Sequence, residues 1–311
     1  MTASSSAAPD GPKAGRSPRA MIWSRRLAGM REFWNEFRQS RSGMAGLIFL
    51  LIVIVLALLA PIIAPDHLLD VTTLGHQPKF GPPSWDHPLG TDGLRRDIGV
   101  RLVWGARISL LVGFAATAMS MIIGTIVGIA VGYFTGWFGA VLMRIVDFFL
   151  VIPSLILAIV LAAVLDRGVF TIVIAIGLTS WAGTARVVRA QTLTVSARDY
   201  VDRSRVLGAG HWHVIVKHLL PGVLPLVLAN TTLTVGSAII SESTLSFLGL
   251  GDATKQSWGT VLQNALSDSA ATSGYWWYIM APGLAIVAVV MAFTMIGRTV
   301  EVILNPTLRS R

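Results

Sequence analysis

Six stretches of 18 to 25 residues without a charged side chain are the feature that most limits how this chain can fold. A bilayer core about 30 Å thick is crossed by about 20 apolar residues in a helix. Backbone groups in lipid must pair within their own segment, which favours helices over other structures. The sequence therefore predicts an all-α polytopic membrane protein with six transmembrane helices. The expected spans are 45–64, 108–132, 148–165, 168–185, 219–241 and 275–297.

The composition excludes several classes of protein. Only 13% of the residues are charged, whereas a soluble domain has about 25%. The chain has no Cys, which excludes disulfides, Cys-ligated metal clusters and thiol catalysis. The net charge is +9, and the basic residues flank the apolar runs. We therefore expect membrane lipid, and no nucleic acid, to be the partner of these charges.

The distribution of basic residues predicts the orientation of the spans. With both termini inside the cell, 18 of the 25 Lys and Arg residues fall in cytoplasmic segments. An excess of Lys and Arg on the cytoplasmic side is the general rule for inner membranes. We expect a multi-pass protein of the cell (plasma or inner) membrane with cytoplasmic N- and C-termini.

The segment before the first span divides into two parts. Residues 1–20 are rich in Ser, Ala, Pro and Gly and are expected to form a disordered tail. Within 21–43, apolar residues recur every three or four positions, with arginines between them. This pattern predicts an amphipathic helix at the inner membrane interface, or alternatively one that packs on a partner protein. The apolar positions are Trp23, Leu27, Met30, Trp34 and Phe37, and the arginines are Arg25, Arg26, Arg31 and Arg38.

Small and bent positions mark the spans themselves. Gly124, Gly128, Gly132 and Gly136 recur every fourth residue and form a ridge for close helix packing, within this chain or against another subunit. Pro153 predicts a kink in the third span.

Two groups of polar or aromatic residues in the spans have alternative interpretations. The polar run Asn230–Thr232 is a candidate for the translocation pathway, and helix–helix hydrogen bonding is the alternative explanation. Trp276, Trp277 and Tyr278 are typical of an interfacial aromatic belt, and substrate stacking is the alternative.

The outer loop, residues 65–107, carries several charged residues close together. His87, Asp92 and Asp97 could serve as metal ligands, but pairing of the two aspartates with Arg95, Arg96 or Arg101 is the favoured interpretation. Gly90 and Gly93 suit turns in this loop.

The inner loop, residues 186–218, is long enough to suggest a function. One short helix is expected up to Gly208 and Gly210, which end it. A second is expected from His213 to Lys217, leading into Pro221. Three histidines, His211, His213 and His218, lie here, but no Cys or well-spaced carboxylate joins them, so we expect no metal site. The shape is that of a docking element on the cytoplasmic face.

At this point the chain resembles a known family. Asp202, Arg203 and Ser204 stand where the EAA motif of binding-protein-dependent ABC importer permeases has an acidic residue and two alanines. Gly208 takes the glycine position of that motif, His218 the isoleucine position, and Leu220–Pro221 match its Leu-Pro. Arg203 is the largest departure, because it places a charge where a small residue normally packs.

Longer segments are similar to the dipeptide and oligopeptide permeases of the DppC/OppC type. These segments begin at His87, Met143, Glu242 and Trp258, and the start of the first span and the C-terminal segment match as well. The resemblance covers nearly the whole chain after Arg41.

The resemblance implies a type I ABC importer permease fold in residues 44–311 and a role as the transmembrane subunit of an ATP-driven importer of di- or oligopeptides. It implies four kinds of partner: a second homologous permease, one or two ATPase subunits, an extracytoplasmic substrate-binding protein and membrane lipid. Nickel and haem are alternative substrates within the subfamily. The residues that it assigns to ATPase coupling are Asp199, Tyr200, Asp202, Arg203, Ser204, Arg205, Leu207, Gly208, Ala209, His218 and Pro221.

The chain itself lacks the motifs of catalysis. No Gly-Lys pair occurs, so there is no phosphate-binding loop for ATP. We expect no catalytic residue, cofactor or metal in this chain, and ATP with magnesium on the partner ATPases. A secondary carrier remains an alternative, but such a protein is expected to have an ionisable group near the middle of a span. An intramembrane enzyme would need paired polar groups there and ranks last.

Overall fold

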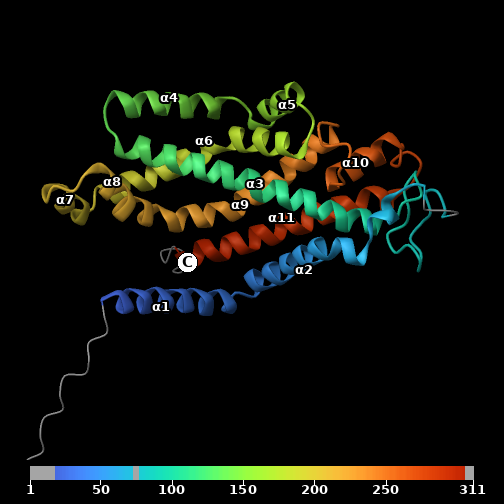
Figure 1. Cartoon of the computed structure of the whole chain (residues 1–311), viewed down its shortest axis with the longest axis horizontal. Helices are drawn as coiled ribbons and strands as arrows, with labels where there is room; N and C mark the ends of the chain where they lie inside the picture. The colour runs from blue at the N-terminus through green and yellow to red at the C-terminus, as the bar shows by residue number, and fades with distance from the viewer. Residues whose placement is uncertain (1–17, 73–76, 305–311) are drawn as a thin grey trace, which may run out of the picture.

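The computed structural model describes residues 18–72 and 77–304, with the backbone alone for 18–27. Within these residues the chain is helical, and the only β-structure is an isolated bridge between Thr91 and Asp97. The long helices run side by side along one axis (Figure 1). Figure 1 also shows α7 and α8 at one end of the molecule and α10 with the outer loop at the other.

The elements follow one another with short connections, apart from the outer loop. They are α1 (Pro18–Gln39), α2 (Arg41–Ile63), the short helix η1 (Asp66–Leu69), α3 (Ile98–Tyr133), α4 (Trp137–Val151), α5 (Ser154–Val164), α6 (Val169–Ser196), α7 (Asp199–Val206), α8 (His211–Val214), the π-helical turn η2 (Ile215–Leu219), α9 (Leu220–Phe247), α10 (Trp258–Ser267) and α11 (Trp276–Leu304).

Five of the described helical segments are each long and apolar enough to cross a membrane. They are α2, α3, α6, the continuous helix His211–Phe247 and α11. The pair α4 and α5 passes the same test only together, which gives six spans if the bent pair is counted as one. The predicted all-helical membrane fold is therefore confirmed.

The centre of the bundle is the contact between α3 and α6, which lie side by side over most of their length (Figure 1). A Cβ atom on Gly124 would lie 2.6 Å from the Thr184 Cβ, and one on Gly128 would lie 2.7 Å from the Ala185 carbonyl oxygen. Gly132 meets Thr192 in the same way. The glycine ridge thus serves packing within the chain. Gly136 is not part of it, because it lies beyond the end of α3 with φ at +93°.

The third expected span is broken at Pro153, as the predicted kink requires. Ile152 has extended backbone angles (φ −80°, ψ 125°), which is the usual effect of a following proline. The two helices on either side, α4 and α5, are bent by 87°. The expected straight range 148–165 is therefore corrected: the first helix begins already at Trp137 and ends at Val151, and the second begins at Ser154.

Several helices extend well beyond the uncharged runs. Helix α3 begins at Ile98, ten residues before the expected span, and the Asp97 side chain caps it by accepting from the Val100 N–H (3.0 Å). Helix α6 continues to Ser196, and α11 continues through Arg298 and Glu301. The outer and inner loops are therefore shorter than 65–107 and 186–218. The expected spans ended at the first charged residue, but a charged residue can continue a helix, so the helices are longer than the uncharged runs.

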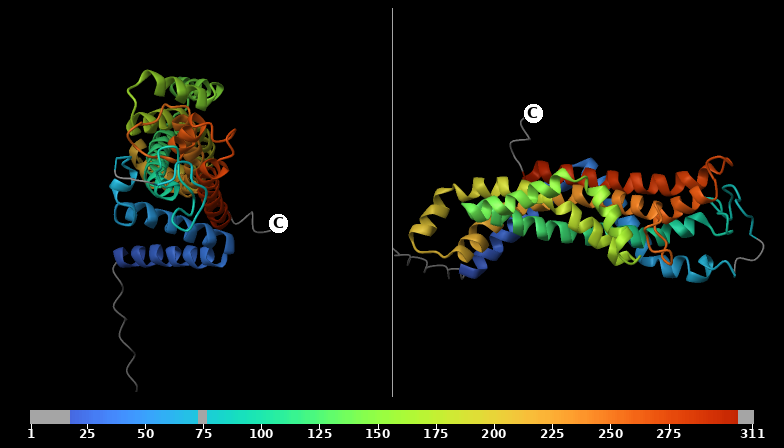
Figure 2. Two further views of the ribbon diagram at one scale, coloured as in Figure 1. Left: turned by 90° about the vertical axis from the view of Figure 1, so that its right-hand side faces the viewer. Right: turned by 90° about the horizontal axis from the view of Figure 1, so that it is seen from above.

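The N-terminal helices pack along the side of the bundle opposite α4 (Figures 1 and 2). Ser40 separates α1 from α2, and its hydroxyl lies 3.0 Å from that of Thr299 in α11. Phe37 of α1 is buried, while Met30 and Trp34 are exposed. The side chains of Trp23, Arg25, Arg26 and Leu27 and residues 1–17 of the expected tail lie outside the described residues. The last three residues of the expected tail 1–20 belong to α1, which begins at Pro18, so that boundary is corrected.

Replacing Gly128 with Ala should destabilise the protein by about 1–3 kcal/mol, because the added methyl group meets backbone atoms that cannot move aside. Gly283→Ala is the matched control, since a Cβ at that helical position meets nothing within 4 Å. The thermal unfolding of the two purified variants in detergent measures the difference. Equal midpoints would contradict the packing role of the ridge.

Candidate functional site

The segment from α7 to η2, which we call the α7–α8 element, forms a compact corner at one end of the molecule. Helix α7 ends in a Schellman motif, in which the Ala209 N–H donates to the Ser204 carbonyl (3.1 Å) and the Gly208 N–H donates to the Arg205 carbonyl (2.9 Å). Gly208 has φ at +85°, a backbone conformation that favours glycine. The expected helix end at Gly208 is confirmed, but the second helix begins at His211 rather than His213 and continues through η2 into α9.

One face of this element is buried against the long helices. Val201 has no exposed surface and packs in one apolar cluster with Val195 at the end of α6 and Val223 at the start of α9. Val214 and Leu219 complete the cluster from α8 and η2. Because these side chains share one apolar cluster, a shift of α7 would disturb the packing at the ends of α6 and α9.

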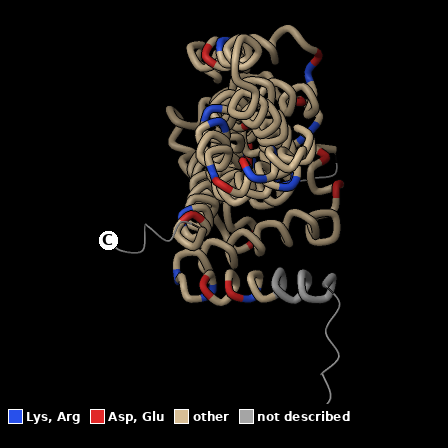
Figure 3. Tube along the Cα trace, turned by 90° about the vertical axis from the view of Figure 1, so that its left-hand side faces the viewer, with Lys and Arg blue, Asp and Glu red and all other residues tan. Residues whose placement is uncertain are grey.

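The opposite face carries large apolar side chains in the open. Val206 and Leu207 are each 87% exposed and Trp212 is 77% exposed, while Tyr200 is half-exposed. Figure 3, which looks at this end of the molecule, shows basic and acidic residues around it. A cluster of exposed apolar residues with a polar rim is typical of a protein-binding surface.

Polar contacts fix the corner from the sides. The Ser204 hydroxyl lies 3.3 Å from the His218 Nε2 atom. His211 Nδ1 lies 2.9 Å from the hydroxyl of Tyr133, at the end of α3. The Arg205 guanidinium stacks over the same tyrosine ring at 5.3 Å. The element is thus joined to α3 as well as to α6 and α9.

The residues assigned to the EAA-like motif occupy different environments. Asp202 and Arg205 form an exposed ion pair (3.0 Å), and Arg203 is exposed beside them. The charge of Arg203 therefore points outward and disturbs no packing. Pro221 lies in the first turn of α9 directly after η2. Proline has no N–H to donate to a backbone carbonyl of the preceding turn. The backbone hydrogen bonds change there to the wider π-helical pattern of η2. Asp199 is the first residue of α7. A shallow recess of about 630 Å³ is lined in part by Tyr200, Arg203, Leu207, Ala209 and His218.

The histidines of this element have separate partners. His211 contacts Tyr133 and His218 contacts Ser204, while the His213 and His218 rings are 5.8 Å apart. In the part of the chain that the structure describes, no three His, Cys, Asp or Glu side chains are grouped to hold a metal ion.

A second feature lies midway along the bundle, where the α4–α5 break faces α3, α6 and α9. It is a cavity of about 560 Å³ with many hydroxyl groups in its wall. Of the polar run in α9, only Asn230 lines it, and the Asn230 amide donates to the Thr184 hydroxyl (3.5 Å). Thr231 and Thr232 donate instead to carbonyls of their own helix. Only Asn230 was signalled by the sequence, because a cavity lined by five helices has no local pattern.

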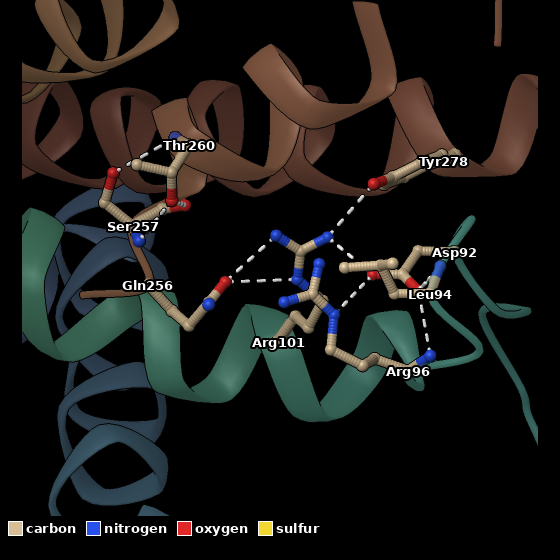
Figure 4. A network of polar contacts seen from close by, with 8 residues as sticks. All are labelled: Asp92, Leu94, Arg96, Arg101, Gln256, Ser257, Thr260 and Tyr278. Atoms are coloured by element: carbon tan, nitrogen blue, oxygen red, sulfur yellow. Dashed lines mark hydrogen bonds and ion pairs between the residues drawn. The ribbon is translucent and has the colours of Figure 1, made fainter. Parts of the chain in front are cut away.

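The other end of the molecule is organised by a buried ionic network (Figure 4). Asp92 accepts from Arg96 Nε (2.8 Å) and from Arg101 Nη1 (2.9 Å), and neither Asp92 nor Arg101 is exposed. Arg101 also donates to the Tyr278 hydroxyl and to the Gln256 side chain. The network joins four parts of the chain: the outer loop through Asp92, α3 through Arg101, α11 through Tyr278, and the segment that precedes α10 through Gln256.

The outer loop partly confirms the sequence interpretation. Asp92 pairs with Arg96 and Arg101 as expected, but Asp97 pairs with His87 (2.8 Å) and not with an arginine. Tyr278 is fully buried in the protein, where its hydroxyl accepts from Arg101, so its side chain does not face lipid as a belt residue would. Trp276 stays exposed.

A buried carboxylate, Glu242, was not assigned a role from the sequence. The hydroxyls of Ser109 and Ser246 each donate to it at 2.8 Å, and Ser109 also accepts from the Trp258 N–H (3.2 Å). Glu242 thus connects α9 to α3 and, through Ser109, to α10. The four-residue spacing of Glu242 and Ser246, one helical turn, was the only sequence feature that could have predicted their hydrogen bond.

Comparison with known proteins identifies relatives along nearly the whole chain. Residues 124–310 match the family described as binding-protein-dependent transport system inner membrane component. Residues 30–78 match the N-terminal TM domain of oligopeptide transport permease C.

Individual relatives are similar over most of their length. The chain is 37% identical over 284 residues to the dipeptide transport system permease protein DppC of Bacillus subtilis, covering 91% of this chain and 87% of that protein. It is 38% identical to the oligopeptide transport system permease protein OppC of the same organism, over 88% of each chain. It is 34% identical to the glutathione transport system permease protein GsiD of Escherichia coli, over 89% of this chain and 90% of that one.

Replacing Asp92 with Asn should destabilise the protein by about 3–5 kcal/mol, because Arg101 would keep a buried charge without its carboxylate. Asp147→Asn is the control. It breaks the exposed pair with Arg186 and should cost less than about 1 kcal/mol. Unfolding of the two variants in detergent, followed by tryptophan fluorescence, compares them. A similar small loss in both would show that the network contributes little.

Proposed function

Because the chain belongs to the family of inner membrane components of binding-protein-dependent transport systems, we propose that it forms half of the translocation pathway of an ATP-driven importer of di- or oligopeptides. The family membership makes it a multi-pass, non-catalytic permease subunit of an ABC importer of the peptide and glutathione type. The choice of substrate within that type is the proposal, supported by the names of the peptide permeases among its relatives.

The observation that carries the mechanism is the two-sided α7–α8 element. Its outer face offers Val206, Leu207 and Trp212 to a partner, and its inner face is locked to α6 and α9 through Val201. A partner bound to the outer face can therefore pull on the ends of two spans. This is what coupling to an ATPase requires: a force applied at a surface outside the membrane must reach the helices that open and close the pathway.

The proposed complex has four kinds of component. A second, homologous permease supplies the other half of the pathway, and one or two ATPase subunits dock under the α7–α8 elements. ATP and magnesium bind on those ATPases. An extracytoplasmic binding protein delivers the substrate to the end that carries the Asp92 network. The termini and the α7–α8 element lie in the cytoplasm, as the distribution of Lys and Arg favours.

In the transport cycle, ATP-driven closure of the ATPases moves the α7–α8 elements together. The ends of α6 and α9 follow, because Val195 and Val223 share an apolar cluster with Val201. The tight α3–α6 contact carries this movement along the bundle as a rigid-body rotation. Alternating access is then a reorientation of packed helices, and no group in this chain changes covalently.

Affinity purification of the tagged chain from its own membranes tests the proposal. An ATPase with a phosphate-binding loop and a second six-span permease should co-purify, and the complex should take up di- or tripeptides in proteoliposomes with ATP. A chain that purifies alone and transports without an ATPase would be a secondary carrier. Uptake of nickel or haem in place of peptides would identify one of the alternative substrates.

Gly208→Val should uncouple transport from ATP hydrolysis while the complex still assembles. Valine disfavours the left-handed backbone that Gly208 requires (φ +85°), so the end of α7 would be displaced. Gly210→Val is the matched control, because Gly210 is equally open but has φ at −67°. ATP-dependent uptake should fall at least tenfold for Gly208→Val only. Unchanged uptake would mean that this element does not couple the two activities.

A further inference from the structure

The cavity at the α4–α5 break is lined by neutral hydrogen-bonding groups from several helices. On α9, four polar residues follow spacings of four, three and four, which places them on one helical face. They are Asn230, Thr234, Ser237 and Ser241. Ser180 of α6 and Ser154 of α5 join them. Among the residues that the structure describes, no charged side chain lines this cavity.

The broken backbone contributes further groups to the same wall. Ile152, Pro153 and Ser154 line the cavity, and a helix end leaves backbone N–H and C=O groups without partners in the helix. Irregular backbone at membrane depth is tolerated where it is buried in protein or borders a water-filled space. The bend thus places two helix ends, with main-chain groups that lack a helical partner, beside the cavity.

Two buried hydroxyls in the wall have no partner in the described structure. Thr117 and Ser120 of α3 are at most 1% exposed, and neither hydroxyl makes a hydrogen bond. Thr179, a buried hydroxyl of α6 in the same wall, donates instead to the Ala175 carbonyl of its own helix (2.8 Å). A buried hydroxyl without a hydrogen-bond partner destabilises the folded state, because its hydration is lost and not replaced. This cost is recovered if a polar guest or water reaches these groups when the helices around the cavity move.

We propose that this cavity is a transport subsite that binds the main chain of a peptide, and that it does so without reading the charge of the side chains. Hydroxyl and amide groups both donate and accept, so they match the alternating N–H and C=O groups of a peptide. A wall without fixed charge neither attracts nor repels acidic or basic side chains. This inference rests on the proposed peptide import and names the residues that would carry it.

The test uses the complete transporter, purified through a tag on this chain and reconstituted with its binding protein and ATP. Uptake of Ala-Ala-Ala, Ala-Lys-Ala and Ala-Glu-Ala is measured for Thr234→Val and Asn230→Leu. The matched control is Thr231→Val. Thr231 and Thr234 each donate to the carbonyl four residues earlier (2.7 and 3.0 Å), but only Thr234 lines the cavity.

Both cavity variants should lose uptake about fivefold, the effect of one lost hydrogen bond, and by the same factor for all three peptides. Thr231→Val should transport like the wild type. Cavity variants that match Thr231→Val, or losses that depend on peptide charge, would overturn the inference while peptide import stands. A wild-type complex that imports none of the three peptides would overturn the proposed function and this inference with it.

A second measurement does not depend on uptake. Since the chain has no Cys, Ser237→Cys and Leu228→Cys each introduce a single thiol. Ser237 lines the cavity, and Leu228 is 55% exposed on the opposite face of α9. A charged, water-soluble methanethiosulfonate should modify the thiol of Ser237→Cys and leave the thiol of Leu228→Cys unmodified. Excess peptide should slow the modification of Ser237→Cys. An unreactive Ser237→Cys would exclude a water-accessible pathway at this place.

Discussion

The close contact between α3 and α6 is the constraint on which the rest of the structure depends. Helices in lipid gain little from apolar burial against each other, so they associate through close packing and hydrogen bonds. Gly124, Gly128 and Gly132 allow that approach, because a Cβ at any of them would meet α6 within 2.7 Å. With α3 and α6 fixed, the bundle has a rigid centre to which both ends of the molecule are attached.

The two ends are attached in chemically different ways. The α7–α8 element is held by apolar packing around Val201 and by contacts to Tyr133, which lies at the end of α3. The opposite end is held by buried charge, with Asp92 and Arg101 at its centre. Apolar packing is non-directional, whereas a buried ion pair is strongly destabilised when its partners separate. This difference suits the proposed roles of the two ends, one that transmits movement and one that keeps its shape.

How far the sequence predicted the site depended on whether the signal was local. Gly208 was recognised as the end of a helix, and its positive φ agrees, because the conformational preference of glycine acts within one turn. The pairing of Asp92 with Arg96 and Arg101 was also expected, since all three lie within ten residues. The burial of Tyr278 was not predicted, because its partner Arg101 is 177 residues away in the sequence. The hydroxyl-lined cavity was missed for the same reason, except at Asn230.

The sequence by itself determined that this chain is a bundle of membrane helices, where Pro153 breaks one of them, and which loop carries the EAA-like motif. These properties follow from uncharged runs, from a missing N–H group and from residues adjacent in the chain. Only the tertiary structure decided the 87° bend of α4 and α5, the direction of the Arg203 side chain and the set of helices around the polar cavity. Each of these depends on how distant segments pack, and the energy of that packing is shared among residues that no local pattern connects.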